Sequence, residues 1–273
     1  MNYIFSEINK KINFLKSASM DNELRIYYQS KFELYLIFIL GYLWSKNLSK
    51  VGLTEREEIA NKILKPSIGT IIQLIRILDI DGEFFGKGKL KKFTEAINRY
   101  PHFRNEKIGH GYSYEDDVTE YLKFFEEIFN LIENNEDKHQ IFSNVDIIKV
   151  LRKNDNSFNG ILFKPNGTYI NWSCVEEVNS FEIFNIYIFS DHLGYFKISP
   201  FICIENEDEF YSYCSIEEKL IGRTKYNKLL KTGSLFKEVH EFEKLLISSD
   251  NHKKKSINGT IINNFNNNLN FRT

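Results

Sequence analysis

The first half of the chain carries apolar side chains at the spacing of an α-helix. Ile4, Ile8, Ile12 and Leu15 show the pattern at the start of the chain, and the strongly apolar stretch 32–44 predicts a buried core helix. Residues three or four positions apart share one face of a helix, so these repeats predict amphipathic helices that bury one side. The predicted helices cover residues 4–15, 22–44, 54–64, 67–78, 89–100 and 115–132. Together they predict an all-α helical bundle over residues 1–138.

Near residue 140 the pattern changes from helical spacing to alternation. Aromatic and β-branched residues alternate with polar ones in short runs, which Asn, Asp and Gly separate. This composition is typical of strands joined by turns. The predicted strands fall within residues 146–151, 160–172 (around a Pro-Asn-Gly turn), 181–189, 195–205 and 209–216, and a closing helix is expected over 234–247. Residues 142–249 are therefore predicted to form a small β-rich domain, which makes the fold class α+β.

The last residues differ from both parts in composition. From Asn251 onward the chain holds eight asparagines in 23 residues. Such a sequence cannot bury enough apolar surface to offset the entropy of ordering. Residues 250–273 are expected to be a disordered linker or tail.

The charge of the chain is balanced overall but unevenly distributed. With 36 Lys plus Arg against 37 Asp plus Glu, the net charge of -1 does not favour a nucleic-acid partner. Residues 87–107, however, hold seven basic residues against Glu95 and Glu106. A run of this kind is most often a solvated surface, but a phosphate-binding footprint has the same composition. The candidate RNA-binding residues in this run are Lys87, Lys89, Lys91, Lys92 and Lys107.

The cysteines and the apolar segments indicate a cytoplasmic protein. Cys174, Cys203 and Cys214 are odd in number and widely spaced, as expected for thiols in a reducing compartment. The N-terminus has no signal-peptide pattern, because Glu7 and two lysines precede any long apolar run. The apolar stretch 32–44 is shorter than the roughly 20 residues that a membrane span needs. We expect no membrane partner.

No familiar metal or nucleotide motif is present. The six histidines form no HExxH pattern and no His/Cys cluster. The stretch GEFFGKGK, residues 82–89, departs from a phosphate-binding loop, because its glycines are one residue too close and Gly88 replaces the Ser or Thr that holds magnesium. We therefore expect no metal and no cofactor.

The stretch RNEKIGHGY, residues 104–112, combines residues that suit RNA cleavage without a metal. His110 can move a proton near neutral pH, and the planar guanidinium of Arg104 can hold a phosphate. In a straight helix, six positions at about 100° each would place the two side chains on different faces. Gly109 and Gly111 could relieve this by letting the backbone turn around His110. The alternative is that Arg104, Asn105 and His110 are ordinary capping residues beside a helix end.

The same stretch resembles the R-x(4–6)-H motif of the HEPN superfamily, in which an asparagine often follows the arginine and a long helix follows the histidine. The resemblance covers residues 1–138, including the strongly apolar second helix and the motif before the last helix. It implies a metal-independent ribonuclease of a prokaryotic toxin, abortive-infection or antiphage system, whose two motifs meet in the cleft of a homodimer. By position, Arg104 and His110 would be catalytic and Asn105 would orient them.

The resemblance also raises a regulatory question about Tyr112. In HEPN toxins that are paired with a minimal nucleotidyltransferase, the tyrosine at this place is adenylylated, which silences the toxin. Those toxins are single short domains, whereas this chain has a β-rich second half, so a packing role is the favoured interpretation of Tyr112. Helices followed by a β domain and a polar linker are similar to the N-terminal regions of bacterial defence proteins that continue into a signalling ATPase domain, which is a possible partner here.

The sequence thus predicts a HEPN-type endoribonuclease and leaves two alternatives open. The first is a non-catalytic HEPN module for dimerisation or sensing, in which the motif residues cap and pack. The second is a nucleic-acid-binding protein that uses the basic run 87–107 without cleavage.

Overall fold

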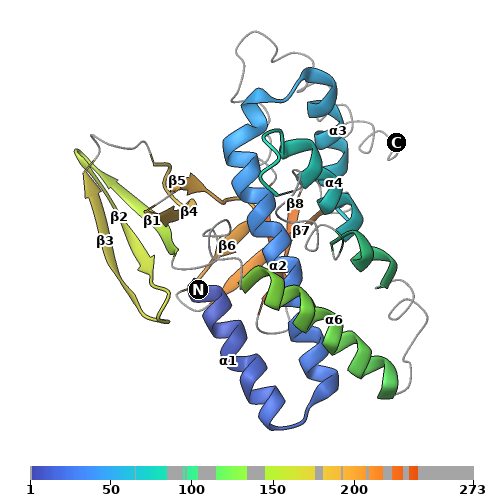
Figure 1. The fold of residues 1–273 in the computed structure, drawn as a ribbon. Helices are drawn as coiled ribbons and strands as arrows, with labels where there is room; N and C mark the ends of the chain where they lie inside the picture. The colour runs from blue at the N-terminus through green and yellow to red at the C-terminus, as the bar shows by residue number, and fades with distance from the viewer. Residues whose placement is uncertain are drawn as a thin grey trace, which may run out of the picture.

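The fold is α+β, with helices in the N-terminal half and strands after residue 145, as predicted (Figure 1). The structure is a computed structural model. It describes residues 2–64, 66–84, 95, 97–103, 115–133, 145–175, 181–191, 193–206, 209–217, 223–229 and 234–238. The predicted tail, residues 250–273, lies outside the described residues.

A long central helix organises the helical half. This helix, α2 (Asp21–Asn47), packs against α1 (Tyr3–Ser17), α4 (Ile68–Leu78) and α6 (Glu115–Glu133). A 3₁₀ turn, η1 (Leu48–Lys50), leads from α2 to α3 (Leu53–Leu64). Short polar residues cap two of these helices: Asn2 accepts a hydrogen bond from the amide of Phe5, and Ser67 accepts one from the amide of Thr70, each 3.1 Å long.

A further helical stretch covers residues 97–103 and immediately precedes the motif. The periodicity predicted that this helix ends at Tyr100, but the helical backbone continues through Pro101 to Phe103. The boundary prediction was wrong by three residues, because Phe103 contributes to the same aromatic packing as Tyr100. Tertiary packing can thus carry a helix beyond the point where the local pattern ends.

The C-terminal half contains two antiparallel sheets. The five-stranded sheet has the order β3-β2-β1-β4-β5, and the four-stranded sheet has the order β6-β7-β8-β9. The strands of the first sheet are β1 (Asp146–Asn154), β2 (Ser157–Phe163), β3 (Tyr169–Val175), β4 (Ile186–Ser190) and β5 (Gly194–Lys197). Those of the second are β6 (Ile202–Ile204), β7 (Phe210–Glu217), β8 (Arg223–Lys228) and β9 (Ser234–Glu238).

Several strand predictions are confirmed, and two details are corrected. The predicted Pro-Asn-Gly turn joins β2 to β3, with Gly167 at a φ of +83° that favours glycine. The single run 195–205 is two strands, β5 and β6, which belong to different sheets on either side of Pro200. Residues 234–238 were expected to begin a helix, but they form β9, because Leu235 pairs with Tyr226 of β8 and packs on the core. Residues 239–247 of that expected helix lie outside the described residues.

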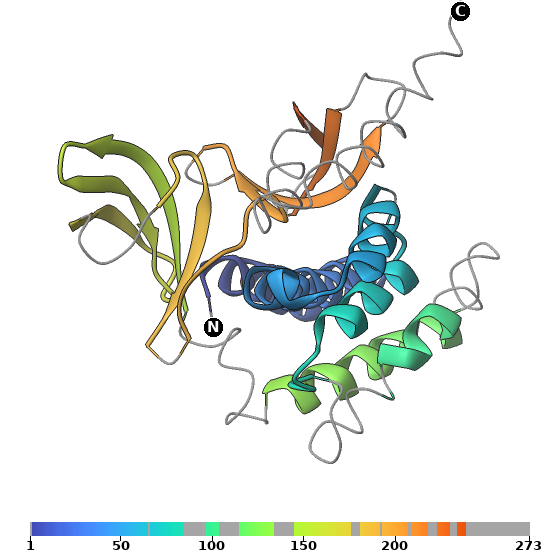
Figure 2. The ribbon, with the colours of Figure 1, turned by 90° about the horizontal axis from the view of Figure 1, so that it is seen from above.

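One hydrophobic core joins the helices to the sheets. Tyr42 and Trp44 of α2 meet Phe196 and Phe201, with ring centroids 5.3 Å and 5.2 Å apart. A methyl group added at Gly41 would lie 2.9 Å from Cγ1 of Ile198, so the glycine permits this close approach. Figure 2 shows α1 and α2 in the middle, with the two sheets on two sides and the other helices on the remaining sides. The helical and β-rich parts therefore stabilise each other.

Among the described residues, no helix combines the length and apolar character that crossing a lipid bilayer requires.

Candidate functional site

The motif itself falls outside the part of the chain that the structure describes. Arg104, Asn105, His110 and Tyr112 lie in the gap between residues 103 and 115. The five candidate RNA-binding residues, Lys87, Lys89, Lys91, Lys92 and Lys107, also lie outside the described residues. The described residues instead define the two ends between which the motif must run: Phe103 on one side and Glu115, the first residue of α6, on the other.

Aromatic packing fixes both flanks of the motif against the bundle. Tyr100 is fully buried, and its ring centroid lies 4.6 Å from that of Phe32 and 5.5 Å from that of Phe125. Phe103, the last described residue before the motif, stacks on Phe124 of α6 with centroids 4.4 Å apart and ring planes 14° apart. Edge-to-face and stacked pairs of this kind add stabilisation beyond the area that they bury. The helical stretch before the motif, residues 97–103, and α6 after it therefore pack against each other (Figures 1 and 2).

Both flanks of the motif pack on the same residue of the central helix. Phe32 of α2 contacts the ring of Tyr100 before the motif and the ring of Phe125 in α6 after it, with centroids 4.6 Å and 5.7 Å apart. The described residues on either side of the motif are therefore fixed relative to α2.

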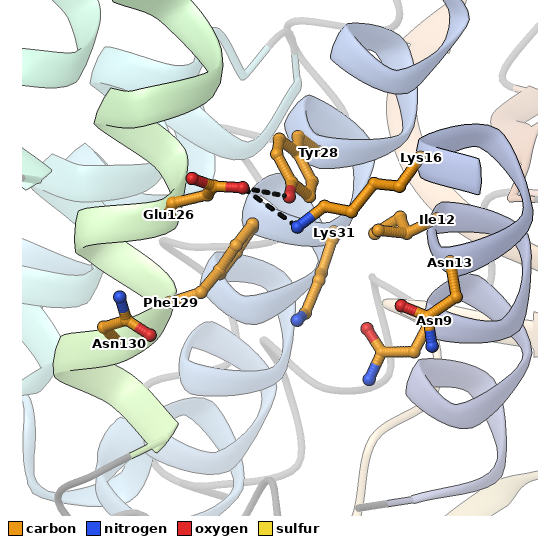
Figure 3. Close-up of a pocket in the computed structure, with 9 residues that line it drawn as sticks. All are labelled: Asn9, Ile12, Asn13, Lys16, Tyr28, Lys31, Glu126, Phe129 and Asn130. Carbon is orange, nitrogen blue, oxygen red and sulfur yellow. Dashed lines mark hydrogen bonds and ion pairs between the residues drawn. The ribbon is translucent and has the colours of Figure 1, made fainter. Parts of the chain in front are cut away.

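A polar pocket lies further along α6, where α1, α2 and α6 meet (Figure 3). Its volume is about 280 Å³. Nine of the described side chains line it: Asn9, Ile12, Asn13, Lys16, Tyr28, Lys31, Glu126, Phe129 and Asn130. Three of them are carboxamides, which can both donate and accept hydrogen bonds.

At one side of this pocket, Glu126 of α6 is held by α1 and α2. The Lys16 ammonium donates to a carboxylate oxygen of Glu126 at 2.9 Å, and the Tyr28 hydroxyl donates to the same oxygen at 2.9 Å. The hydrogen bond from Lys16 lowers the pKa of Glu126, against the opposing effect of partial burial. Partial burial lowers the pKa of Lys16, but its bonds to Tyr28 and Glu126 outweigh this and raise it overall. Both groups are therefore charged at neutral pH.

Lys31 is the most buried charged group of the pocket. Its relative exposure is 5%, although it lies in the middle of α2. Its ammonium lies 4.2 Å from the ring centroid of Phe129, which is the geometry of a cation–π contact. In Figure 3 the ammonium points into the space between Phe129 and Asn9. Sequence reasoning missed this residue, although a lysine directly before the apolar run 32–44 was a visible signal.

A second, smaller cavity of about 170 Å³ lies between the two sheets. Here the charged groups meet one another: the Lys149 ammonium donates to the Glu205 carbonyl at 2.6 Å, and Lys237 pairs with the Glu205 carboxylate at 2.7 Å. Burial lowers the pKa of Lys149, although Glu205 opposes this shift. Burial raises the pKa of the Cys203 thiol to about 12, so this thiol stays neutral and is a poor nucleophile. This arrangement suits a structural link between the sheets.

Within the described ranges, no group of three His, Cys, Asp or Glu side chains is placed to hold a metal ion. Comparisons of this chain with protein-family models, with curated proteins and with solved structures found no match.

Proposed function

We propose that this protein is a metal-independent endoribonuclease of the HEPN type, acting as a toxin or in an abortive-infection or antiphage defence system. The observation that carries the proposal is the position of the Arg104–His110 stretch between two helices that aromatic stacking holds together. Supporting it are the helices in the described part of the first half, among them the long helix α6 that follows the motif. The resemblance of the motif to the HEPN pattern supplies the residue roles.

In the proposed reaction, the imidazole of His110 accepts the proton of a ribose 2'-hydroxyl. The oxygen attacks the adjacent phosphorus, and the bond from phosphorus to the 5'-oxygen breaks. The leaving 5'-oxygen takes up a proton from the imidazolium of a second copy of the motif. The products are a 2',3'-cyclic phosphate and a 5'-hydroxyl, and no step of this reaction needs a metal ion. Proton transfer of this kind contributes about a hundredfold to ten-thousandfold in rate.

Arg104 and Asn105 have different roles in this scheme. The guanidinium of Arg104 stabilises the extra negative charge that develops on the phosphorane, through two parallel N–H donors. Asn105 orients the arginine and the histidine by hydrogen bonds. The basic run from Lys87 to Lys107 binds the phosphates on either side of the cleaved bond.

The proposal requires a homodimer, because each chain supplies one motif. The dimer contacts would involve the helices that flank the motif, in a two-fold arrangement that brings two copies of His110 together. Light scattering at micromolar concentration should give the mass of two chains. A mass of one chain under conditions in which RNA is cleaved would contradict this part of the proposal.

The test of catalysis uses two matched histidine variants. His110→Ala should lower the rate of RNA cleavage by about a hundredfold or more, while RNA affinity changes little. His102→Ala is the control, because His102 is exposed on the helix just before the motif and lies outside the R-x(4–6)-H pattern. Arg104→Lys keeps the charge but loses the bidentate geometry, so it should also cleave poorly. If His110→Ala cleaves at the rate of the unaltered protein, the chain is a non-catalytic dimerisation or sensing module or a nucleic-acid-binding protein.

A further inference from the structure

The outer strand of the five-stranded sheet has the features of an edge that pairs with another chain. Within the described residues, β3 (Tyr169–Val175) pairs with β2 on one side, and its other side forms the left margin of the molecule in Figure 1. We propose that β3 pairs antiparallel with β3 of a second copy of this chain, so that the two five-stranded sheets become one continuous sheet. The proposal does not depend on the ribonuclease activity.

The side chains of β3 are exposed to solvent on both faces of the sheet. Tyr169, Ile170 and Val175 are 46%, 51% and 57% exposed. By contrast, Phe158 and Leu162 of the neighbouring strand β2 are buried. Consecutive side chains of a strand point to opposite faces, so the exposure of both Tyr169 and Ile170 leaves both faces open at the start of β3. The outer main-chain N–H and C=O groups of such a strand can pair with another strand.

β3 lacks the features by which proteins protect an edge strand. Protection comes from charged side chains, proline, a bulge or a very short strand. The sequence of β3 is YINWSCV, and all seven residues pair with β2 in regular register. Residues 157–175, which form the β2–β3 hairpin, hold one charged residue, Lys164, although 27% of the whole chain is charged. Lys164 pairs with Asp146 at 2.9 Å, so it would not repel a neighbouring chain.

The other outer strands of the two described sheets are better protected. β5 has four residues and ends at Lys197, which pairs with Glu182. β6 has three residues, all of them buried. β9 ends with Lys237 and Glu238. Among the described strands, β3 therefore has the outer edge that is both long and uncharged.

A second copy of β3 fits this edge along its full length. Two antiparallel copies related by a two-fold axis overlap over all seven residues when the two copies of Trp172 face each other. Trp172 and Cys174 already pack against the smaller apolar cluster of this sheet. Facing residues of paired strands lie on the same side of a sheet, so pairing would join the clusters of the two copies through the two tryptophans. Because β3 carries no charge, no like charges would meet.

The pairing should be weak and should depend on protein concentration. One strand from each chain buries less surface than the roughly 1,200–2,000 Å² of a standard stable interface. If the chains also form the dimer proposed through the flanks of the motif, a second two-fold contact at β3 would join those dimers into larger assemblies. Such assemblies should therefore form above the micromolar range.

Hydrogen exchange of the full chain, measured by mass spectrometry, tests the pairing at residues 169–175. When the protein concentration is raised roughly hundredfold from the micromolar range, the outward-facing amides of β3 should exchange at least about tenfold more slowly, because pairing shields them. Equal protection at both concentrations would mean that another segment of the same chain, such as residues 250–273, covers the edge. Absence of protection at both concentrations would mean that no second copy pairs there. Either result overturns the proposal.

Charge variants identify the second copy as the partner. In the proposed register, Asn171 of each chain faces Ser173 of the other, and both side chains are exposed. Asn171→Lys combined with Ser173→Lys should abolish the concentration-dependent protection, because like charges then face each other. Asn171→Asp combined with Ser173→Asp should do the same. An equal mixture of the two double variants should regain the protection, since lysines then face aspartates, and a mixture that stays unprotected would overturn the proposal.

The matched control adds the same charges elsewhere on the same sheet. Asn154 and Asn156 are exposed at the turn between β1 and β2. This turn lies about 10 Å or more from the strand of a second copy, at least two strand spacings away. Asn154→Lys combined with Asn156→Lys should therefore keep the concentration-dependent protection of β3. Loss of protection in this control would show general repulsion between chains and would overturn the assignment to the edge of β3.

Discussion

Two cavities among the described residues contain similar side chains but use them differently. In the β-rich part, Lys149 and Lys237 both contact Glu205, and these contacts join the two sheets. In the helical part, the cavity is larger, three carboxamides line it, and the ammonium of Lys31 is directed into it. Charged groups that satisfy one another are structural, whereas polar groups around an open space can meet a ligand. The charged groups between the sheets therefore serve packing, whereas the helical cavity keeps polar side chains around an open space.

The first prediction tests whether the β-rich part is chemically inert. With Cys174 and Cys214 replaced by serine, only Cys203 remains for thiol labelling. With its pKa raised to about 12 by burial, the thiolate fraction of Cys203 at about pH 8 is roughly a thousandfold below that of a peptide thiol. Labelling by a thiol-specific reagent should be slower by at least this factor in the folded protein. Unfolding in guanidinium should restore the labelling rate of an ordinary peptide thiol. Rapid labelling of the folded protein would contradict the interpretation that the β-rich part is chemically inert.

A second prediction compares basic residues of the two parts in RNA binding. Replacing Lys89, Lys91 and Lys92 with alanine should weaken RNA binding and reduce its salt dependence by about 0.7 in log–log slope for each phosphate that is no longer neutralised. The matched control changes the same charge in the β-rich part, at Arg152, Lys153 and Lys225. Equal effects of the two triple variants would mean that RNA does not follow the run 87–107.

The third prediction concerns the aromatic packing that holds the flanks of the motif. Phe103→Ala removes the stack on Phe124 and should destabilise the protein by about 3 kcal/mol, the lower end of the range for phenylalanine, because Phe103 is only partly buried. RNA cleavage at a temperature where the variant is folded should also fall, since the motif would lose one fixed end. Phe14→Ala is the control: its side chain is 57% exposed, so the change should be within about 0.5 kcal/mol. If Phe103→Ala cleaved RNA at the full rate, the stacking of Phe103 on Phe124 would not be needed for cleavage.

The smallest effect is expected at the Lys16–Glu126 pair. Both side chains are nearly half exposed, so Glu126→Gln should cost about 0.2–1 kcal/mol. Because the folded pKa of Glu126 is lowered from 4.5, its contribution is present above that pH and is lost as the pH falls below it. The folded pKa of Lys16 is raised from 10.5, so its contribution is present below that pH and is lost as the pH rises above it. Denaturant unfolding should show a difference between the variant and the unaltered protein near neutral pH that disappears in acid.

The helix α6 was predictable from the sequence because it buries one continuous stripe. Tyr121, Phe125 and Phe129 of α6 are all buried, as the apolar spacing required. The end of the helix before the motif was not predictable, since it depends on the contact between Phe103 and Phe124. Contacts between helices that are distant in sequence leave no local signal.

The sequence predicted that most of these segments are strands. It did not predict where each strand ends or which sheet it joins. Residues 195–205 form one alternating run in the sequence, but β5 and β6 belong to different sheets, which the pattern cannot indicate. β8 (Arg223–Lys228) was not predicted because its sequence is mostly polar, and it becomes a strand by pairing with β7 and β9. A helix was expected where β9 lies, and this segment forms a strand because it pairs with β8.

The candidate sites differ in how far the sequence could define them. The Arg104–His110 stretch is local, so the sequence alone suggested it, and its role stays a prediction. The pocket around Lys31 depends on α1, α2 and α6 coming together, and only the fold brings Asn9, Lys31 and Phe129 to one place. Sites assembled from distant segments need the structure before they can be proposed.

The most direct test of the central claim is the chemistry of the cleaved ends. The purified protein is incubated in EDTA with an RNA oligonucleotide and with DNA of the same sequence, and the products are identified by mass spectrometry. We expect that the RNA alone is cut, that the products carry 2',3'-cyclic phosphate and 5'-hydroxyl ends, and that His110→Ala yields almost none of them. Cleavage of the DNA, or cleavage of RNA that stops in EDTA, would contradict a metal-independent mechanism that uses the 2'-hydroxyl.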